Sequence, residues 1–278
     1  MWYRVSVCIS FTKYLHERSS KKVLLEERKT IILDYLNQHH TVDLQTLVTM
    51  TSASESTLRR DLDSLEDEGL LIRVHGGAKL KKGVNPVIGE EPRFSDKVLD
   101  NANEKRMIAQ YAVSLIEKGE TIYLDAGTTS LLMLDFITPD MQLNIITNGV
   151  NQAIVAAGKG LNIQLLGGTL RGNTQAIVGQ SAHKQLKKYH FHHVFLGMNG
   201  IDLNDGLTTT DEAEAFLKEQ AAYQSIDVHV MIDQSKFEKT YPITVTLNCE
   251  FQVVTNMFKD RHAKEDFTQV YKIKEVNN

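Results

Sequence analysis

One pattern restricts the fold more than any other: short apolar runs alternate with helical stretches through the second half of the chain. The runs lie at 121–125, 143–147, 162–166, 193–198 and 228–233, and a helix is expected at about 104–118. Apolar runs of this length, bounded by turn residues, are typical of strands buried on both faces. Helices between successive strands favour a largely parallel sheet with helices on both sides. The pattern therefore predicts an α/β domain at residues 104–278.

Residues 23–80 show a different pattern, in which three short helices precede a hairpin. Asp43 and Ser54 are expected to cap the second and third helices, because their side chains can accept backbone N–H bonds. Gly69 supplies a left-handed end to the third helix. A short apolar strand and the His-Gly-Gly turn at 75–77 complete the pattern of a winged helix-turn-helix.

The third helix separates apolar side chains from basic and hydroxyl ones. The apolar positions expected to face inward are Leu58, Leu62 and Leu65. The polar and basic side chains near its start are Ser54, Ser56, Thr57, Arg59 and Arg60, and those on the wing are Arg73, His75 and Lys79. Recognition helices enter the major groove by their N-terminal residues, and wings contact phosphates or the minor groove.

An isolated arginine pair is usually a solvated helix face. Here a Ser/Thr-rich turn precedes the pair and a basic glycine hairpin follows it, which favours DNA binding. The net charge of −4 excludes a generally basic surface, so the DNA contact must come from a local patch. We therefore predict that the polar and basic side chains of the third helix and the wing bind double-stranded operator DNA.

The same residues resemble a known module. The stretches ERKTIILDYL and SASESTLRRDLDSLEDEGLLIRVHGGA are similar to the DNA-binding module of the DeoR family of bacterial sugar regulators. The family string SxxTxRRDLxxLExxGxLxRxHGGA is matched at Ser54, Thr57, Arg59, Arg60, Asp61, Leu62, Leu65, Gly69, His75, Gly76 and Gly77. Leu58 is one small departure, where the family often has another aliphatic residue. The resemblance implies a transcriptional repressor of a sugar-utilisation operon.

Several loops rich in glycine, hydroxyl and amide groups follow the predicted strands. The first, LDAGTTS at 124–130, joins a strand to a helix, and backbone N–H groups at such a turn bind anions. Further loops lie at 147–149, 167–168, 197–200 and 233–236. Ligands bind at the carboxyl edge of an open α/β sheet, where these loops meet. The pattern favours a polar pocket for a phosphorylated polyol; the alternative is that the glycines only form tight turns.

These loops extend the resemblance over about residues 24–256. LDAGTTS, ITNG, LLGGTLR, GMNGID and DQSKF are similar to the DeoR-family sensor domain, which resembles the ribose-phosphate isomerase and CoA-transferase fold. The likeness implies that the phosphate or sugar is held by Asp125, Gly127, Thr128 and Thr129, with Asn148, Gly168, Arg171, Asp202 and Lys236 as further contacts. GMNGIDLNDGLTTTDEAEAFLK looks nearest to fructose-operon repressors of Gram-positive bacteria. It suggests fructose 1-phosphate as the effector, with tagatose or galactose phosphates as alternatives, and a link to the phosphotransferase system.

Two other functions compete with this interpretation. A sugar-phosphate isomerase could draw acid–base groups from Asp125, Asp202, Glu212, Glu214 and Lys218. An isomerase needs no DNA-binding module, so we predict a regulator and not an enzyme, without catalytic residues. An architectural DNA-binding protein would leave the large second domain without a purpose.

No cofactor is expected. His190, His192 and His193 flank an apolar strand without the cysteine or carboxylate spacing of a metal site. The glycine-rich runs do not form GxGxxG after the first strand, which argues against a nicotinamide cofactor.

The remaining features concern the N-terminal extension, the linker between the domains and the cellular location. Residues 1–22 are an extension without a signal-peptide core or cleavage site, and a misplaced start or a disordered tail would explain them. Residues 81–103 contain two of the four prolines and little periodicity, which predicts a linker. The two cysteines are far apart and no apolar run reaches the ~18 residues of a membrane span, so we expect a cytoplasmic protein. We also expect a homo-oligomer.

Overall fold

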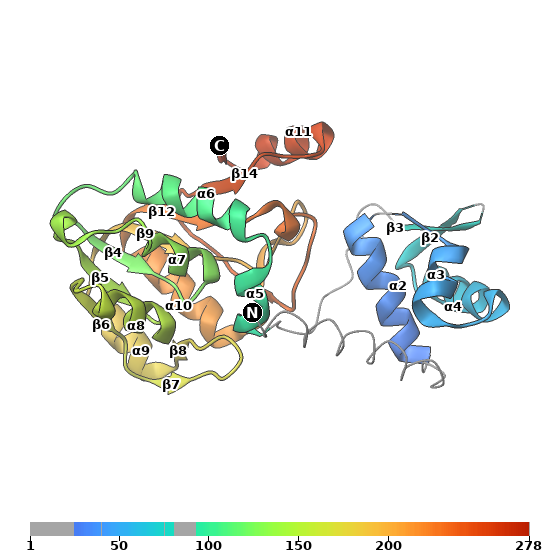
Figure 1. Cartoon of the computed structure of the whole chain (residues 1–278), viewed down its shortest axis with the longest axis horizontal. Helices are drawn as coiled ribbons and strands as arrows, with labels where there is room; N and C mark the ends of the chain where they lie inside the picture. The colour runs from blue at the N-terminus through green and yellow to red at the C-terminus, as the bar shows by residue number, and fades with distance from the viewer. Residues whose placement is uncertain (1–24, 40, 75, 81–92, 278) are drawn as a thin grey trace, which may run out of the picture. The chain divides into compact units, whose positions relative to one another are not determined.

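The computed structural model describes residues 25–39, 41–74, 76–80 and 93–277. The chain divides into two compact units, residues 1–86 and 87–278, both drawn in Figure 1. The predicted extension at 1–22, the wing residue His75 and the linker stretch 81–92 lie outside the described residues.

The first unit contains the three predicted helices and the predicted hairpin (Figure 1). In chain order its elements are α2 (Leu25–His39), β1 (Thr41–Asp43), α3 (Leu44–Thr51), α4 (Glu55–Asp67), β2 (Leu71–Val74) and β3 (Gly77–Leu80). The strands form one antiparallel sheet in the order β1-β3-β2. This is the winged helix-turn-helix that the sequence predicts.

The helix ends of this unit follow from its capping residues. The Asp43 carboxylate accepts the N–H of Thr46 at 2.8 Å, and the Ser54 hydroxyl accepts the N–H of Thr57 at 3.3 Å. Gly69 has a φ of 78°, the left-handed conformation that lets the chain leave α4. The leucines at 58, 62 and 65 are at most 1% exposed, as predicted. Each buried leucine contributes about 1.5–3 kcal/mol to the packing of α4.

The second unit is built on a seven-stranded sheet in the order β15-β14-β12-β9-β4-β5-β6 (Figure 1). Its strands are β4 (Thr121–Leu124), β5 (Asn144–Thr147), β6 (Ile163–Leu165), β9 (Phe191–Leu196), β12 (Ser225–Met231), β14 (Gln252–Asn256) and β15 (Ile273–Val276). Every neighbouring pair is parallel. The five predicted strands and their parallel arrangement are confirmed, and β14 and β15 extend the sheet beyond them.

Helices cover both faces of this sheet, as predicted. They are α6 (Ala102–Val113), α7 (Thr128–Met133), α8 (Val150–Gly158), α9 (Gln180–Leu186), α10 (Glu212–Tyr223) and α11 (Arg261–Val270). One apolar core joins α6, α7 and α8 to side chains such as Ile122 and Leu124. The other joins α9, α10 and α11 to side chains such as Tyr123. Successive β4 residues thus point to opposite faces, each buried under helices.

Shorter elements complete the unit. They are a small antiparallel sheet of β10 (Gly200–Asp202), β11 (Gly206–Thr209) and β13 (Ile243–Thr244), a hairpin of β7 (Thr169–Leu170) and β8 (Ile177–Val178), and the 3-10 turns η1 (Pro139–Met141) and η2 (Gln234–Lys236). Among the described residues, no helix is both long and apolar enough to cross a bilayer.

The predicted linker is wrong in its second half. Residues Phe94–Leu99 form helix α5, and α6 begins at Ala102. The Phe94 N–H donates to the carbonyl of Asn173 at 3.0 Å, so α5 is attached to the second unit. Helix α5 could not be predicted because six residues are fewer than two helical turns and show no apolar period.

Candidate functional sites

The start of α4 presents a cluster of hydroxyl groups. Ser54 Oγ lies 3.0 Å from Ser56 Oγ and 2.9 Å from Thr57 Oγ1, so the three predicted DNA contacts form one hydrogen-bonded group at the helix N-terminus. The next turn adds Arg59 and Arg60, both exposed. The predicted juxtaposition of hydroxyl and basic groups at this end of α4 is present.

The two arginines differ in their surroundings. Arg59 Nη2 lies 3.3 Å from Glu55 Oε2, and both side chains are more than half exposed. A surface pair of this kind is worth little, so a phosphate can replace the glutamate. Arg60 makes no ion pair with any residue that the structure describes.

The wing arginine turns back onto α4. Arg73 Nη1 lies 3.1 Å from Asp63 Oδ1 and donates to the carbonyl of Arg59 at 3.1 Å. The Arg73 N–H also donates to Glu66 Oε1 at 2.7 Å. Arg73 therefore fastens the wing to the recognition helix, a role that its position in the hairpin did not suggest. Lys79, on β3, is exposed.

A buried ion pair sets the position of α4 against α2. Arg28 Nε lies 2.7 Å from Asp61 Oδ2, and Arg28 Nη2 donates to Asp61 Oδ1 at 3.1 Å. The side chains are 10% and 5% exposed. The hydrogen bond to Asp61 raises the pKa of the Arg28 guanidinium. Removing one partner of such a pair leaves an uncompensated buried charge, so Asp61 fixes α4 against α2.

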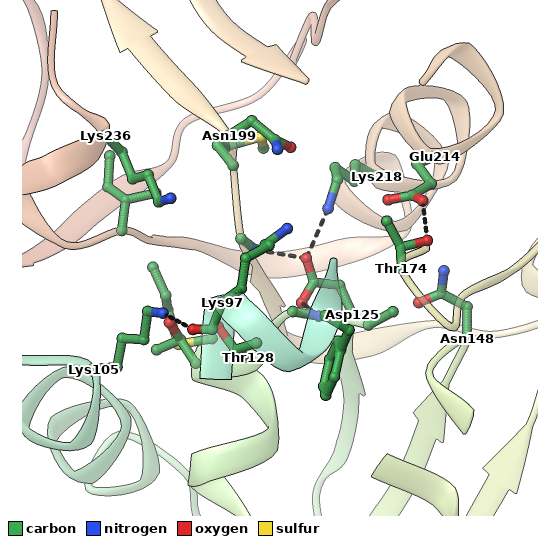
Figure 2. Close-up of a pocket in the computed structure, with 18 of the residues that line it drawn as sticks. Lys97, Lys105, Asp125, Thr128, Asn148, Thr174, Asn199, Glu214, Lys218 and Lys236 are labelled. Carbon is green, nitrogen blue, oxygen red and sulfur yellow. Dashed lines mark hydrogen bonds and ion pairs between the residues drawn. The ribbon is translucent and has the colours of Figure 1, made fainter. Parts of the chain in front are cut away.

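The second unit has a cleft at the carboxyl edge of its sheet, with about 720 Å³ of free space partly open to solvent. Six of the predicted effector contacts line it: Asp125, Gly127, Thr128, Thr129, Asn148 and Lys236. They follow β4, β5 and β12 in the chain. These strands are far apart in the sequence but close in the sheet, where β4 pairs with β5 and only β9 separates β4 from β12. Figure 2 shows how their side chains lie.

Asp125 organises the floor of this cleft. Its Oδ1 accepts the Gly127 N–H at 2.9 Å and the Ser130 hydroxyl at 2.6 Å. Its Oδ2 accepts the Gly197 N–H at 2.6 Å and lies 2.7 Å from Lys218 Nζ. Burial alone would raise the pKa of Asp125, but Lys218 and these hydrogen bonds lower it below its usual value. The carboxylate thus takes the Gly127 amide that the sequence suggested for the effector.

Three further lysines bring positive charge to the cleft. Lys97 comes from α5, Lys105 from α6 and Lys236 from η2. Lys105 is 3% exposed, and its ammonium donates to the carbonyl of Lys97. Burial lowers the pKa of Lys105, and the nearby Asp233 carboxylate acts against that shift. The fourth lysine of the cleft, Lys218, is paired with Asp125. The positive charge offered to a ligand therefore comes from Lys97, Lys105 and Lys236.

The opposite side of the cleft carries neutral and acidic oxygen atoms. Figure 2 shows Asn148, Thr174 and Glu214 across from Lys105 and Lys236. The Thr174 hydroxyl donates to Glu214 Oε1 at 2.6 Å. Asn148 is 4% exposed; its Nδ2 donates to the Ile177 carbonyl at 3.3 Å, while its Oδ1 has no hydrogen-bond partner among the described residues. A buried acceptor without a donor is costly unless a ligand hydroxyl supplies one.

Three predicted contacts do not line this cleft. The Arg171 guanidinium pairs with Asp211 and lies 3.4 Å from Glu214 Oε1, so it holds the cleft wall from outside. Asp202 Oδ1 accepts the N–H groups of Asn204 and Asp205 and closes the β10–β11 turn.

Gly168 packs against β8, where an added Cβ would lie 2.4 Å from the Val178 carbonyl oxygen. A glycine at 168 therefore lets the two backbones approach closely.

The sequence analysis missed Lys97, Lys105 and Thr174 and treated Lys218 and Glu214 only as groups for an enzyme. Lys97 lay in the predicted linker, and a lysine on a helix normally signals a solvated face.

His193 and His229 form a separate buried pair. His193 Nδ1 lies 3.1 Å from His229 Nε2, and His193 Nε2 lies 3.3 Å from Glu120 Oε2. His192 Nδ1 accepts the N–H of Thr121 at 3.1 Å. No group of three histidine, cysteine or acidic side chains suited to a metal ion occurs among the residues described.

Comparison with known proteins identifies both units. The DeoR-like helix-turn-helix domain matches residues 28–84, and the DeoR C-terminal sensor domain matches residues 100–261. An uncharacterized HTH-type transcriptional regulator FruR of Bacillus subtilis is 41% identical over 215 residues, 77% of this chain and 84% of the relative. The lactose phosphotransferase system repressor of Staphylococcus epidermidis is 31% identical over 254 residues, 90% of this chain and 98% of the relative.

Among solved structures, the chain is similar to ribose 5-phosphate isomerase A from Methanocaldococcus jannaschii. The sequence identity is 17% and the TM-score is 0.38, over 50% of this chain and 56% of that chain.

Proposed function

The chain belongs to the DeoR family of DNA-binding transcriptional repressors of sugar metabolism, and from that premise we propose that a phosphorylated sugar bound in the cleft controls it. The matching families and relatives are transcriptional regulators and not enzymes, as the sequence predicted. The helix-turn-helix implies DNA as a partner, and the sensor domain implies a small-molecule effector.

One observation carries the proposal for the ligand: the cleft is divided between positive charge and hydroxyl-binding oxygen atoms. Lys105 and Lys236 lie on one side, Lys97 lies between the sides, and Asn148, whose Oδ1 has no hydrogen-bond partner among the described residues, lies on the other. Ammonium groups in a partly dehydrated site bind phosphate strongly. Amide and carboxylate oxygen atoms accept hydrogen bonds from sugar hydroxyls. A molecule with a phosphate at one end and a polyol at the other fits both.

Fructose 1-phosphate is our proposed effector. The similarity of residues 197–218 to fructose-operon repressors supports it, as does the name FruR of the B. subtilis relative. The name of the staphylococcal relative refers to the lactose phosphotransferase system, so tagatose and galactose phosphates are the alternatives to compare. Thr128 and Thr129 lie in the same cleft and offer hydroxyl donors to either end of the ligand.

The DNA-binding half of the proposal rests on the start of α4. Ser54, Ser56, Thr57, Arg59 and Arg60 enter the major groove, and Lys79 contacts the backbone phosphates from the wing. Arg73 contributes by holding the wing against α4. A homo-oligomer would bind two half-sites of one operator, as dimers of this motif do. The protein would act in the cytoplasm, where the operator lies.

Isothermal titration calorimetry of the full chain tests the ligand. Fructose 1-phosphate should bind at least about tenfold more tightly than fructose, since a charge-assisted hydrogen bond is worth about 1.5–3 kcal/mol. Fructose 6-phosphate and the tagatose phosphates set the preference among phosphorylated sugars. Equal affinity for fructose and its phosphate would contradict the proposal, and so would conversion of the sugar phosphate during the titration.

A further inference from the structure

Helix α5 has two connections that no other described element combines: it lines the cleft, and it is the first described element after the stretch that joins the two units. Phe94 and Lys97 both line the cleft. No residue of α5 is fully buried. A six-residue helix is far below the length at which helices are stable alone, so α5 depends on its contacts.

The contacts that hold α5 come from the walls of the cleft. The Phe94 N–H donates to Asn173, the neighbour of the cleft residue Thr174. The Lys97 carbonyl accepts from the buried ammonium of Lys105.

The turn between α5 and α6 is fixed in the same way. The Asn101 side-chain amide donates to Asp233 Oδ1 at 3.0 Å, and Asp233 caps the η2 turn that carries Lys236. The ends of α5 are therefore both tied to the cleft.

The charges around α5 favour an anion. The ammonium groups of Lys97, Lys105 and Lys236 all line the cleft near this helix, and Asp233 is the carboxylate that lines it beside them. Asp125 is paired with Lys218, and Glu214 accepts from Thr174 and lies near Arg171. Burial disfavours the charged form of Lys105, and a bound dianion would stabilise that form.

Resting on the proposed function, we infer that the phosphate of the effector binds between Lys97, Lys105 and Lys236 and thereby fixes α5, the element that reports occupancy to the DNA-binding unit. The chain runs from β3 through residues 81–92 directly into α5. Coupling between two sites needs an element whose state both sites influence. Helix α5 meets that need, because Lys97 would contact the phosphate and α5 is the first described element after the stretch that follows β3 in the chain.

Hydrogen exchange of the full chain, followed by mass spectrometry, tests this inference. Saturating fructose 1-phosphate should slow exchange in peptides covering 94–99 and in peptides covering 125–130, while fructose at the same concentration should slow neither. The Lys97→Gln variant should bind fructose 1-phosphate about tenfold or more weakly. At saturation it should still protect 125–130 but no longer 94–99.

Two further variants separate charge from folding. Lys97→Arg keeps a cation and should restore protection of 94–99. Lys118→Gln removes an exposed lysine that does not line the cleft, and it should behave as the unchanged protein. Comparable melting temperatures for the three variants would show that the fold is retained.

The outcomes distinguish the inference from the function on which it rests. Protection of 125–130 with unchanged exchange at 94–99 would overturn the role of α5 and leave the proposed effector intact. Full protection of 94–99 in Lys97→Gln at saturation would overturn the role of Lys97. If neither fructose 1-phosphate, fructose 6-phosphate nor a tagatose phosphate binds the unchanged protein, the proposed effector class fails and the inference fails with it.

Discussion

Asp125 Oδ2 lies 2.7 Å from Lys218 Nζ, and the two side chains are 2% and 11% exposed. The pair joins the end of β4 to helix α10, and its two residues are 93 positions apart in the chain. Because Asp125 also accepts the Gly127 and Gly197 N–H groups, one carboxylate fixes the loops after β4 and β9. The floor of the cleft is therefore held by contacts within the protein.

Replacing Lys218 by Met should destabilise the second unit by about 3–5 kcal/mol, since it leaves the Asp125 carboxylate buried without its cation. Urea unfolding monitored by circular dichroism gives the free energy of unfolding. The double variant Asp125→Asn with Lys218→Met should recover part of the loss, because no charge is then left unpaired. A single variant as stable as the unchanged protein would show that the pair does not hold the cleft.

Arg60 and Lys79 should affect DNA binding in different ways. Arg60→Ala should cost about 1–3 kcal/mol at the operator and relax sequence preference, as expected for an arginine that contacts a base. Lys79→Ala should weaken binding to all sequences and reduce the slope of log affinity against log salt by about one. Gel-shift titrations on operator and unrelated DNA at several salt concentrations measure both effects. The docking of α4 would be wrong if Arg59→Ala and Arg60→Ala each bound operator DNA with unchanged affinity and preference.

Buried His229 should make the second unit sensitive to acid. Burial, with a smaller effect from His193, lowers the pKa of His229 to about 4 from its ordinary 6.5. The unfolded chain therefore binds a proton at His229 below pH 6.5, whereas the folded chain binds it only near pH 4. The contribution of neutral His229 to the free energy of unfolding is complete above pH 6.5 and is lost as the pH falls from 6.5 toward 4.

Between pH 7.5 and pH 5 the expected loss from His229 is about 2 kcal/mol in the free energy of unfolding. Urea titrations at the two pH values measure it. His229→Gln should remove most of this difference, and His262→Gln, at an exposed position, should not. Equal acid sensitivity of His229→Gln and the unchanged protein would assign the effect to other groups.

Most of the fold could be predicted from the sequence because its signals are local. Buried strands such as 121–124 are apolar runs, and caps such as Ser54 hydrogen-bond within one turn. Strand β15, with the sequence IKEV, has only two apolar residues and lies at the edge of the sheet, so no run marks it. Helix α5 was missed because six residues cannot show a helical period.

The cleft was predicted only where a loop carries its own signal. Asp125 and Asn148 directly follow strands, so the topology places them at the carboxyl edge. Lys105 is buried because α6 meets α5, a contact between helices that sequence spacing does not show. Arg171 follows a glycine pair that suggested a ligand loop, yet its charge is matched by Asp211 and Glu214. Tertiary pairing of charges, which decides between ligand contact and support, is not visible in the sequence.

The most direct test of the central claim is the effect of a phosphorylated sugar on operator affinity. Fluorescence anisotropy of a labelled operator fragment should show about a 5- to 150-fold change in affinity when fructose 1-phosphate saturates the protein, the range of typical coupling energies. Fructose should cause no change. Lys236→Ala should abolish the response while binding operator DNA normally without ligand, because Lys236 lies in the second unit. An operator affinity that stays the same with every phosphorylated sugar that binds the protein would contradict the claim.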